Sequence, residues 1–370
     1  MQPPRKPADA PAITVVGLRV LAEPLEAVAV ENGKDGSAMT KLARLRYPTE
    51  EMTMSQLSPV SETTSRCLTN SGLALALFLL AICGRGFAQQ AGQKTFSSAD
   101  EASQALFAAV QGDDKSALRE IFGSAGEEII SSGDQVQDQN ARDQFVARYQ
   151  EMHRVGNDPD GTATLYIGAE NWPLPIPLVH RGNAWYFDSV TGKKEILYRR
   201  IGRNEFAAME VCDVLVQAEL DYYSQSRDGR PQQYAAKFAS DEGKHNGLYW
   251  KTSADEPESP VGPLVAYAAG EGYGKKQGEG PTPFHGYFYR ILTAQGASAP
   301  GGAKSYIVNG EMTGGFAILA YPAVYRSSGV MTFMVGQDGI IYQKDLGPKT
   351  AEAANAIKAF APDKTWHKAE

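Results

Sequence analysis

The most extended amphipathic pattern in the sequence lies near the middle of the chain, in residues 204–225. Apolar side chains recur there every three or four residues, which is the spacing of one face of an α-helix. The first set comprises Phe206, Met209, Cys212, Val216, Leu220 and Tyr223. A second set, comprising Val211, Leu215, Ala218 and Tyr222, widens the stripe. This width predicts a helix from Asn204 to Gln225 that packs against other elements on more than one side.

Helical patterns precede strand patterns in the region before this helix. Ser98 and Glu101 have the spacing of a capping box, in which the Glu101 carboxylate accepts from the Ser98 amide, so a helix is expected to begin here. Further helices are expected over residues 115–122 and 136–154. Strands are expected at Thr162 to Ile167, Ile176 to His180 and Trp185 to Ser189, the last two as a hairpin. This order predicts an α+β unit, and it resembles the cone-shaped nuclear-transport-factor-2-like fold, which often encloses a pocket.

Strand patterns dominate the region after the long helix. Residues 251–283 are rich in Pro and Gly and predict a long loop with one short helix at Leu264–Ala269. Strands are expected at Tyr287 to Leu292, Ser305 to Val308, Phe316 to Tyr321, Val330 to Val335 and Ile340 to Lys344, and a terminal helix at Thr350 to Phe360. The C-terminal part is therefore expected to be a second α+β unit, in which the long helix packs on an antiparallel sheet.

An uncharged apolar run from Gly72 to Ile82 is about half as long as a membrane span. A charged start, this short apolar core and the small residues before Gln89 are typical of a secretory signal peptide. We expect the signal peptide to occupy residues 52–88 and to be cut after Ala88, which places the mature protein in the periplasm or outside the cell. Membrane contact is then expected through the cleaved signal peptide alone. Residues 1–51 are interpreted as an upstream extension from a misassigned start codon, or as disordered.

The charge balance argues against nucleic-acid binding. The formal net charge is −7, whereas phosphate contacts need clustered Lys and Arg. The three cysteines cannot form a disulfide framework, and Cys212 alone follows the predicted cut. Because Cys212 lies on the apolar helix face, we expect it to be a core residue rather than a nucleophile.

Chemically active residues are few and do not form an established motif. The sequence has no Gly-x-Ser-x-Gly or His-Glu-x-x-His, and its five histidines lack metal-ligand spacing, so no cofactor and no metal are expected. His285, in a Pro- and Gly-rich loop beside Tyr287 and Arg290, is the catalytic candidate, with a structural hydrogen bond as the alternative. Trp172 is a candidate recognition residue, or it caps the N-terminal sheet. Glu205 is expected on a solvated helix face, in ion pairs with Arg199 and Arg203.

Several strings together identify a family resemblance. They are Trp172 to Pro177, Arg200 to Glu205, Pro281 to Tyr287, Gly314 to Ala317, Tyr321-Pro322 and Ser328 to Phe333. They resemble the bacterial secreted proteins of domain-of-unknown-function family 2950, over nearly all of residues 93–370. The resemblance implies an exported location and brings no activity with it.

The C-terminal half is also similar to the globular heads of type IV pilins and pseudopilins. The likeness rests on the order of a long helix, the strand containing Gly286 to Phe288, and the turn from Gln337 to Ile340. In pilins the helix lies at the mature N-terminus and has an apolar extension. Here Arg199, Arg200 and Arg203 precede the helix in mid-chain, so it cannot build a filament in that way.

Two functions remain open for the domains that we predict at residues 93–200 and 201–370. The first is a non-catalytic binding or assembly module whose Pro- and Gly-rich loops and aromatic edges contact a cell-envelope protein or glycan. Its candidate binding residues are Trp172, His285, Tyr287 and Arg290. The second is a small-molecule-binding protein or hydrolase-type enzyme that uses a pocket near His285 or in the N-terminal cone. The sequence leaves the question of enzymatic activity and the oligomeric state open.

Overall fold

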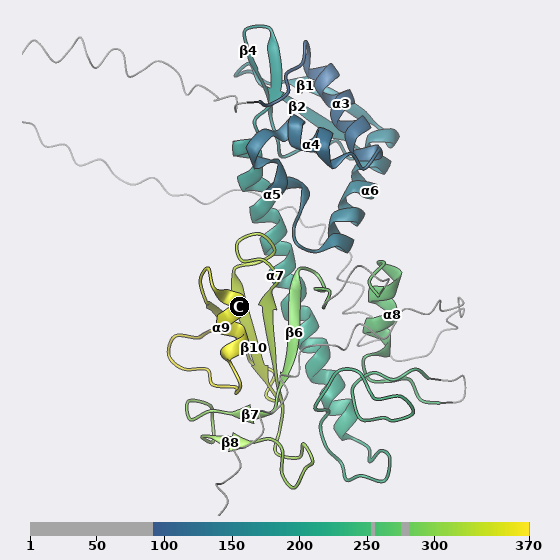
Figure 1. Cartoon of the computed structure of the whole chain (residues 1–370), viewed down its shortest axis with the longest axis vertical. Coiled ribbons are helices and arrows are strands. Elements are labelled where there is room, and N and C mark those ends of the chain that lie inside the picture. The colour runs from purple at the N-terminus through teal and green to yellow at the C-terminus, as the bar shows by residue number, and fades with distance from the viewer. Residues whose placement is uncertain (1–91, 253–255, 275–280, 370) are drawn as a thin grey trace, which may run out of the picture.

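The computed structural model describes residues 92–252, 256–274 and 281–369, and these residues form an α+β protein, as expected (Figure 1). The predicted signal peptide, its cut after Ala88 and the extension over residues 1–51 lie outside the described residues. Two groups of helices and strands lie at opposite ends of one long helix, α7, which spans Ser189–Tyr223 (Figure 1).

The N-terminal unit contains short helices on one antiparallel sheet. Its helical elements are α3 (Ala99–Gln111), α4 (Lys115–Phe122), the 3-10 helix η1 (Gly123–Ala125), α5 (Gly126–Ile130) and α6 (Gln135–Glu151). Its strands are β1 (His153–Asn157), β2 (Ala163–Ile167), β3 (Trp172–Pro173), β4 (Leu178–Arg181) and β5 (Ala184–Phe187). The described strands pair in the order β1-β2-β4-β5, with β3 beside β2. The predicted hairpin around residues 181–183 is confirmed.

Local sequence explains where the helices of this unit begin. Ser98 is the N-cap of α3 and its side chain accepts from the Glu101 amide at 3.0 Å. The Glu101 carboxylate binds Ser97 rather than the Ser98 amide, so the expected capping box is shifted by one residue. The helix expected over residues 136–154 ends at Glu151, because the chain turns there into β1 and pairs with β2.

The helix α7 begins fifteen residues earlier than the sequence pattern predicts, at Ser189 instead of Asn204. Asp188 caps it by accepting from the Thr191 amide at 3.2 Å. Gly192 interrupts the apolar pattern in this first part, but a Cβ there would lie 2.6–2.8 Å from Ile176, so tertiary packing requires the glycine. The predicted boundary between residues 200 and 201 falls inside this continuous helix and stays a prediction.

The C-terminal unit is an antiparallel sheet with a helix on each face. Its helices besides α7 are α8 (Gly262–Gly270) and α9 (Thr350–Ala356). Its described strands pair in the order β12 (His367–Lys368), β11 (Ile341–Asp345), β10 (Met331–Gly336), β9 (Ala317–Pro322) and β6 (Tyr287–Leu292). A separate pair consists of β7 (Ala294–Gln295) and β8 (Lys304–Ser305), where a longer strand, Ser305 to Val308, was expected.

Alternation along β6 decides which side chains face which helix, because successive residues of a strand point to opposite faces. Tyr287 and Tyr289 lie on the α7 side, where they share a pocket with Leu215. Arg290 lies on the other side and donates to the carbonyls of Ala354 and Ile357 at 2.5 and 2.6 Å. The long helix thus packs on an antiparallel sheet, as predicted.

The wide apolar stripe on α7 was predicted to pack on more than one side, and most of its residues are buried or half-buried. Cys212 is fully buried, and burial raises the pKa of its thiol, in agreement with a core role. Phe206 and Leu220 differ, being 66% and 40% exposed, because the sheet and α8 cover only part of the helix circumference. None of the described helices combines the length and the apolar character needed to span a bilayer.

Candidate functional site

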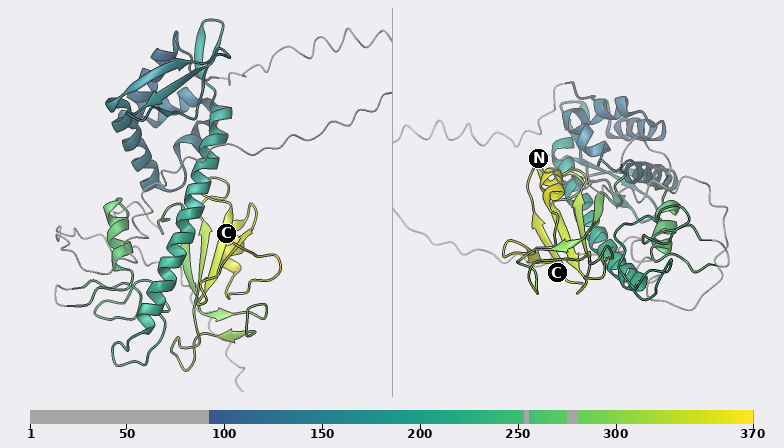
Figure 2. Two further views of the ribbon diagram at one scale, coloured as in Figure 1. Left: turned by 180° about the vertical axis from the view of Figure 1, so that it is seen from behind. Right: turned by 60° about the horizontal axis from the view of Figure 1, so that its bottom comes forward.

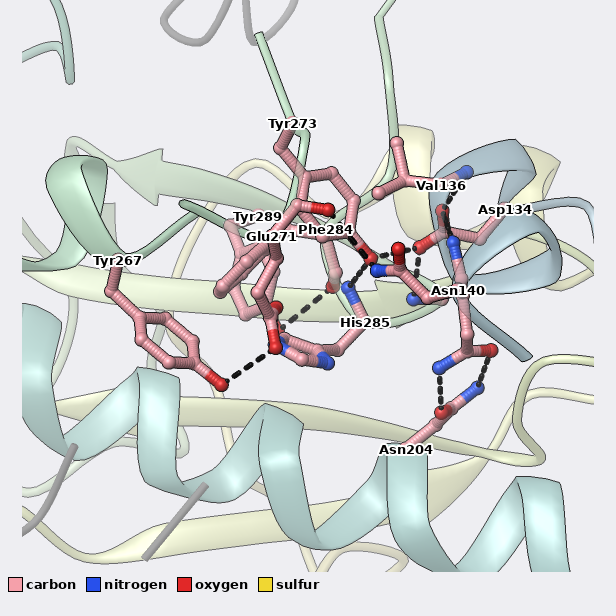
Figure 3. A network of polar contacts seen from close by, with 12 residues as sticks. Asp134, Val136, Asn140, Asn204, Tyr267, Glu271, Tyr273, Phe284, His285 and Tyr289 are labelled. Carbon is pink, nitrogen blue, oxygen red and sulfur yellow. Dashed lines mark hydrogen bonds and ion pairs between the residues drawn. The ribbon is translucent and has the colours of Figure 1, made fainter. Parts of the chain in front are cut away.

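The two units are joined at a buried carboxylate, Asp134, which caps the N-terminus of α6. One oxygen, Oδ1, accepts from the amides of Val136 and Gln137, each at 3.1 Å. The other, Oδ2, accepts from the Tyr273 hydroxyl at 2.8 Å and from the Gly286 amide at 3.0 Å (Figure 3). Asp134 therefore connects a helix of the N-terminal unit with two loops of the C-terminal unit.

The electrostatics at Asp134 are a balance between burial and hydrogen bonding. Burial raises the pKa of this carboxyl, while the hydrogen bonds from Gln137, Tyr273 and Gly286 oppose the rise. Burial and the adjacent Asp134 carboxylate together raise the pKa of Tyr273, which stays a neutral donor. With two helix amides and two loop donors, the carboxyl is satisfied without a ligand.

Further contacts fix the same junction. Asn204 on α7 exchanges hydrogen bonds with the Gln137 side chain (Figure 3). It also donates to the Ser328 carbonyl at 2.9 Å. Gly286 has φ +75°, and a Cβ there would lie 2.5 Å from the Asn204 amide nitrogen. Only glycine allows both this backbone conformation and this close approach.

Arg200 provides a charged bridge next to these residues. Its guanidinium donates to the carbonyls of Glu128, Ile129 and Ser131 at 3.0–3.2 Å, at the end of α5. It also reaches the Ser327 hydroxyl in the C-terminal unit at 3.3 Å. A cation near the unpaired carbonyls of a helix end is stabilising, so Arg200 acts as a structural cap.

His285, the catalytic candidate, lies at the edge of this junction. Its backbone has φ +49°, a left-handed conformation that is uncommon outside glycine. Its Nε2 lies 3.2 Å from Oε2 of Glu271, an ion-pair distance without hydrogen-bond alignment. The Tyr267 hydroxyl donates to the other Glu271 oxygen at 2.8 Å (Figure 3). Tyr267, Glu271 and His285 thus form a short polar chain from α8 to the loop before β6.

An apolar pocket of about 60 Å³ lies between α7, α8 and β6. The volume is several times the ~10–15 Å³ that one water molecule needs. Its walls are mainly aliphatic and aromatic, and they include Leu215, Leu264, Ala268, Phe284, Tyr287 and Tyr289. Thr282 also lines the pocket. This lining can accommodate an apolar group but offers few partners for a polar one.

The structure brings only some of the predicted site residues together. Tyr287 forms part of the pocket wall and donates from its hydroxyl to the Met331 carbonyl at 2.9 Å. Arg290 lies on the opposite face of the sheet, where it caps α9. Trp172 lies in the N-terminal sheet, 46% exposed, with the guanidinium groups of Arg148 and Arg199 5.7 and 5.8 Å from its ring. Of the four predicted site residues, Tyr287 alone lines the pocket, and their role in binding stays a prediction.

Sequence reasoning missed three carboxylates that hold this region. Asp134 had the signature of a helix N-cap, but nothing local indicated its partners at Tyr273 and Gly286. Glu271 lies in a Pro- and Gly-rich segment in which no local pattern indicated its partners. Glu205 was expected on a solvated face, yet its Oε1 accepts from the Val330 and Met331 amides at 2.9 Å and fixes the start of β10. Arg199 pairs with Glu195 instead.

An imidazole and a carboxylate are side chains that transfer protons in general acid–base chemistry, so such chemistry would be located at the His285 and Glu271 pair. Within the parts of the chain that the structure describes, no group of three His, Cys, Asp or Glu side chains is arranged to hold a metal ion. His285 itself does not line the apolar pocket; its imidazole contacts the ring of Phe284, which does line it, with ring centroids 4.3 Å apart.

The fold and the site together define an α+β protein in which one shared helix joins two antiparallel sheets through a polar junction next to an apolar pocket. Residues 93–369 match the model of the family described as Protein of unknown function (DUF2950), and the chain belongs to this family. Searches of curated proteins and of solved structures found no significant match. The likeness to pilin heads therefore stays a prediction.

Proposed function

We propose that this protein is a non-catalytic binding module of the cell envelope, and that its pocket accommodates an apolar group of a protein partner. The observation that carries this proposal is the lining of the pocket between α7, α8 and β6. Its walls are aliphatic and aromatic, while the nearby polar groups Asp134, Tyr273 and Asn204 are engaged in hydrogen bonds within the chain. An apolar side chain gains free energy in such a site through burial.

The expected export of the chain defines the class of partner. A signal peptide over residues 52–88 with a cut after Ala88 would deliver the protein to the periplasm or the cell exterior, where it meets envelope proteins and glycans. A glycan needs donors and acceptors for its hydroxyl groups, and a buried hydroxyl without a hydrogen bond costs free energy. The pocket therefore favours a protein side chain over a sugar.

Photo-crosslinking in living cells tests this proposal. A photoreactive phenylalanine analogue replaces Thr282 at the pocket, and a matched variant carries it at Ile307, which is 42% exposed and outside this pocket. We expect a defined crosslinked envelope protein with the analogue at residue 282 and none at residue 307. The additional substitution Ala268→Phe fills the pocket and should remove the crosslink. Equal crosslinking at both positions, or crosslinking unaffected by Ala268→Phe, contradicts the proposal.

A hydrolase-type enzyme is the second candidate, favoured by the polar chain of Tyr267, Glu271 and His285 and by the left-handed backbone at His285. Strained residues concentrate at functional sites. The variant His285→Ala separates the two candidates. Both candidates predict that this variant keeps the crosslink from position 282. Cells that carry the variant should behave like cells with the parent protein if the protein is a binding module. They should behave like cells that lack its activity if it is an enzyme.

A further inference from the structure

The two edges of the N-terminal sheet differ in how the chain covers them. At one edge, Phe96 exchanges two main-chain hydrogen bonds of 2.8 Å with Trp185 of β5. At the other edge lies β1, whose five residues are all exposed or half-buried. Figure 2 (left) shows this sheet from the side that its helices leave uncovered. The chain thus closes the β5 edge and leaves the β1 edge accessible.

The outward main-chain groups of β1 are unpaired within the described residues. In an antiparallel pair, alternate residues bond the neighbouring strand. Asp158 donates from its amide to the Thr162 carbonyl at 2.9 Å, and the register from there on places the even-numbered residues of β1 in hydrogen bonds with β2. His153, Val155 and Asn157 therefore point their N–H and C=O groups away from β2, where no described residue bonds them. One short strand presents six such groups.

This edge also lacks the features that usually prevent strand pairing. Natural edge strands are protected by proline, by charged side chains, especially lysine, or by a bulge. The strand β1 has neither Pro nor Lys, and its register with β2 is continuous over all five residues. Its one charged residue at neutral pH, Arg154, packs over the ring of Tyr166 on β2, with the guanidinium 4.0 Å from the ring centroid. This charge is therefore directed toward β2 and away from the open edge.

The strand is complementary to an antiparallel copy of itself. When Val155 lies opposite Val155 of a second copy, His153 of each copy lies opposite Asn157 of the other. These are the residues whose main-chain groups point outward, so all six groups of each strand meet a partner. In the same register Arg154 lies opposite Gly156, so two arginines do not meet. The half-buried Val155 side chains come together at the centre of the pairing.

We propose that two copies of this chain pair antiparallel through β1, with the two-fold axis at Val155. The interface is isologous, because the same strand is used by both copies. A second copy is favoured over a disordered peptide, since β1 is already extended and loses little conformational entropy on pairing. The exposed acids Glu151 and Asp160 approach the other copy only beyond the paired residues, where salt screens their charges. The contact is small, and we expect a dissociation constant of about 1–100 μM.

Disulfide trapping tests the pairing and its register. One preparation of the full chain carries Val155→Cys and another Asn157→Cys, each with Cys67 and Cys83 replaced by Ser, while Cys212 is buried. At the two-fold axis the two residues 155 have Cα atoms about 5.5 Å apart, which a disulfide can span. The two residues 157 are separated by about 14 Å along the strands.

Under mild oxidation we therefore expect a crosslinked dimer from Val155→Cys and none from Asn157→Cys. A parallel pairing in register would crosslink both variants, and a strand supplied by another protein would crosslink neither into a dimer. Either result overturns the proposal.

Sedimentation equilibrium of the purified protein supplies the second test. The substitution Asn157→Pro removes an outward amide that bonds nothing in its own chain, and proline is tolerated at such edge positions. We expect concentration-dependent dimers from the unmodified protein and at least a tenfold weaker association for Asn157→Pro. The matched control is Asn157→Ala, which keeps the amide and should leave association unchanged. Circular dichroism verifies that both variants are folded. A strictly monomeric parent protein at about 200 μM, or equal losses in both variants, refutes the pairing.

Discussion

Two fully buried carboxyl groups in different parts of the molecule have contrasting environments. Asp134, at the junction of the two units, accepts four hydrogen bonds. Glu219, on the lower part of α7, accepts one, from the Ala235 amide at 2.8 Å. Its other oxygen, Oε1, has no hydrogen-bond partner among the described residues. The two groups have the same chemistry, and they differ only in what the fold has placed around them.

The difference follows from their positions in helices. Asp134 is an N-cap, where free helix amides point at the carboxylate. Glu219 lies inside a helix whose own amides are already bonded, so its donors must come from elsewhere. Burial raises the pKa of Glu219 well above its ordinary value, opposed by one hydrogen bond. Hence the junction is built around a well-bonded carboxyl, whereas the C-terminal core contains a carboxyl that favours the protonated form.

The largest effect is expected from Asp134→Asn. The amide group can still cap α6 through its oxygen, but its nitrogen then faces the Tyr273 hydroxyl and the Gly286 amide, which are both donors. Leaving buried donors unpaired costs about 1–3 kcal/mol each, so we expect the free energy of unfolding to fall by about 2–5 kcal/mol. Urea denaturation monitored by circular dichroism measures this change.

The matched control for this variant is Asp114→Asn. Asp114 caps α4 by accepting from the Ala117 amide alone, at 2.9 Å, and asparagine is an equally good N-cap. Its unfolding free energy should change by less than about 0.5 kcal/mol. Similar losses in both variants would mean that the contacts from Asp134 to the C-terminal unit contribute nothing.

A smaller effect of opposite sign is expected from Glu219→Gln. A carboxyl whose pKa is raised on folding contributes most to stability below its unfolded pKa, near 4.5, and this contribution is lost as the pH rises through the folded pKa. A glutamine side chain does not ionise and has no such loss, so the variant should be more stable than the parent at pH 7, by on the order of 2 kcal/mol. The difference in stability between Glu219→Gln and the parent protein should narrow toward pH 4.5.

Thermal denaturation at several pH values measures this dependence. Glu352→Gln is the control, because the Glu352 side chain is 74% exposed and its substitution should not alter the pH profile. A gap between Glu219→Gln and the parent protein that stays constant from pH 4.5 to pH 8 would show that Glu219 is ionised in the folded state.

The smallest effect is expected at His285, whose ring lies beside the junction without being part of its hydrogen-bond network. Asparagine tolerates φ near +49° better than most residues, so His285→Asn should change the free energy of unfolding by less than about 1 kcal/mol. His285→Val is the comparison, since a β-branched residue is strained in this conformation. Calorimetry distinguishes the two, and equal melting temperatures would show that the backbone at residue 285 is not constrained.

Local patterns predicted the elements that depend on local interactions. The strand Tyr287–Leu292 and the helix Lys115–Phe122 were predicted with their observed bounds, because alternation and capping are properties of neighbouring residues. The first part of α7 was missed because Gly192 and Gly202 weaken its helical pattern. The reason for a glycine at residue 192 is its close approach to Ile176, which exists only in the folded state.

The candidate site was predictable to a lesser extent. His285 and Tyr287 were singled out because they lie in a short loop and on the strand that follows it; Tyr287 lines the pocket, whereas His285 does not. Asp134 lies 139 residues before Tyr273 and 152 before Gly286. Sequence spacing carries no information about contacts at such separations. The opposite facing of Arg290 and Tyr287, by contrast, follows from their odd spacing on one strand and could have been predicted.

The continuity of α7 has a consequence for how this molecule can change through insertion and deletion. The helix has 35 residues and is about 52 Å long. One residue added near Gly202 would turn the C-terminal unit by about 100° relative to the N-terminal unit and shift it by about 1.5 Å. Asp134 would then face a different part of the C-terminal unit, away from Tyr273 and Gly286. The middle of α7 therefore fixes both the rotation and the distance between the two units. Single-residue insertions there should be far less tolerated than insertions in the surface loops.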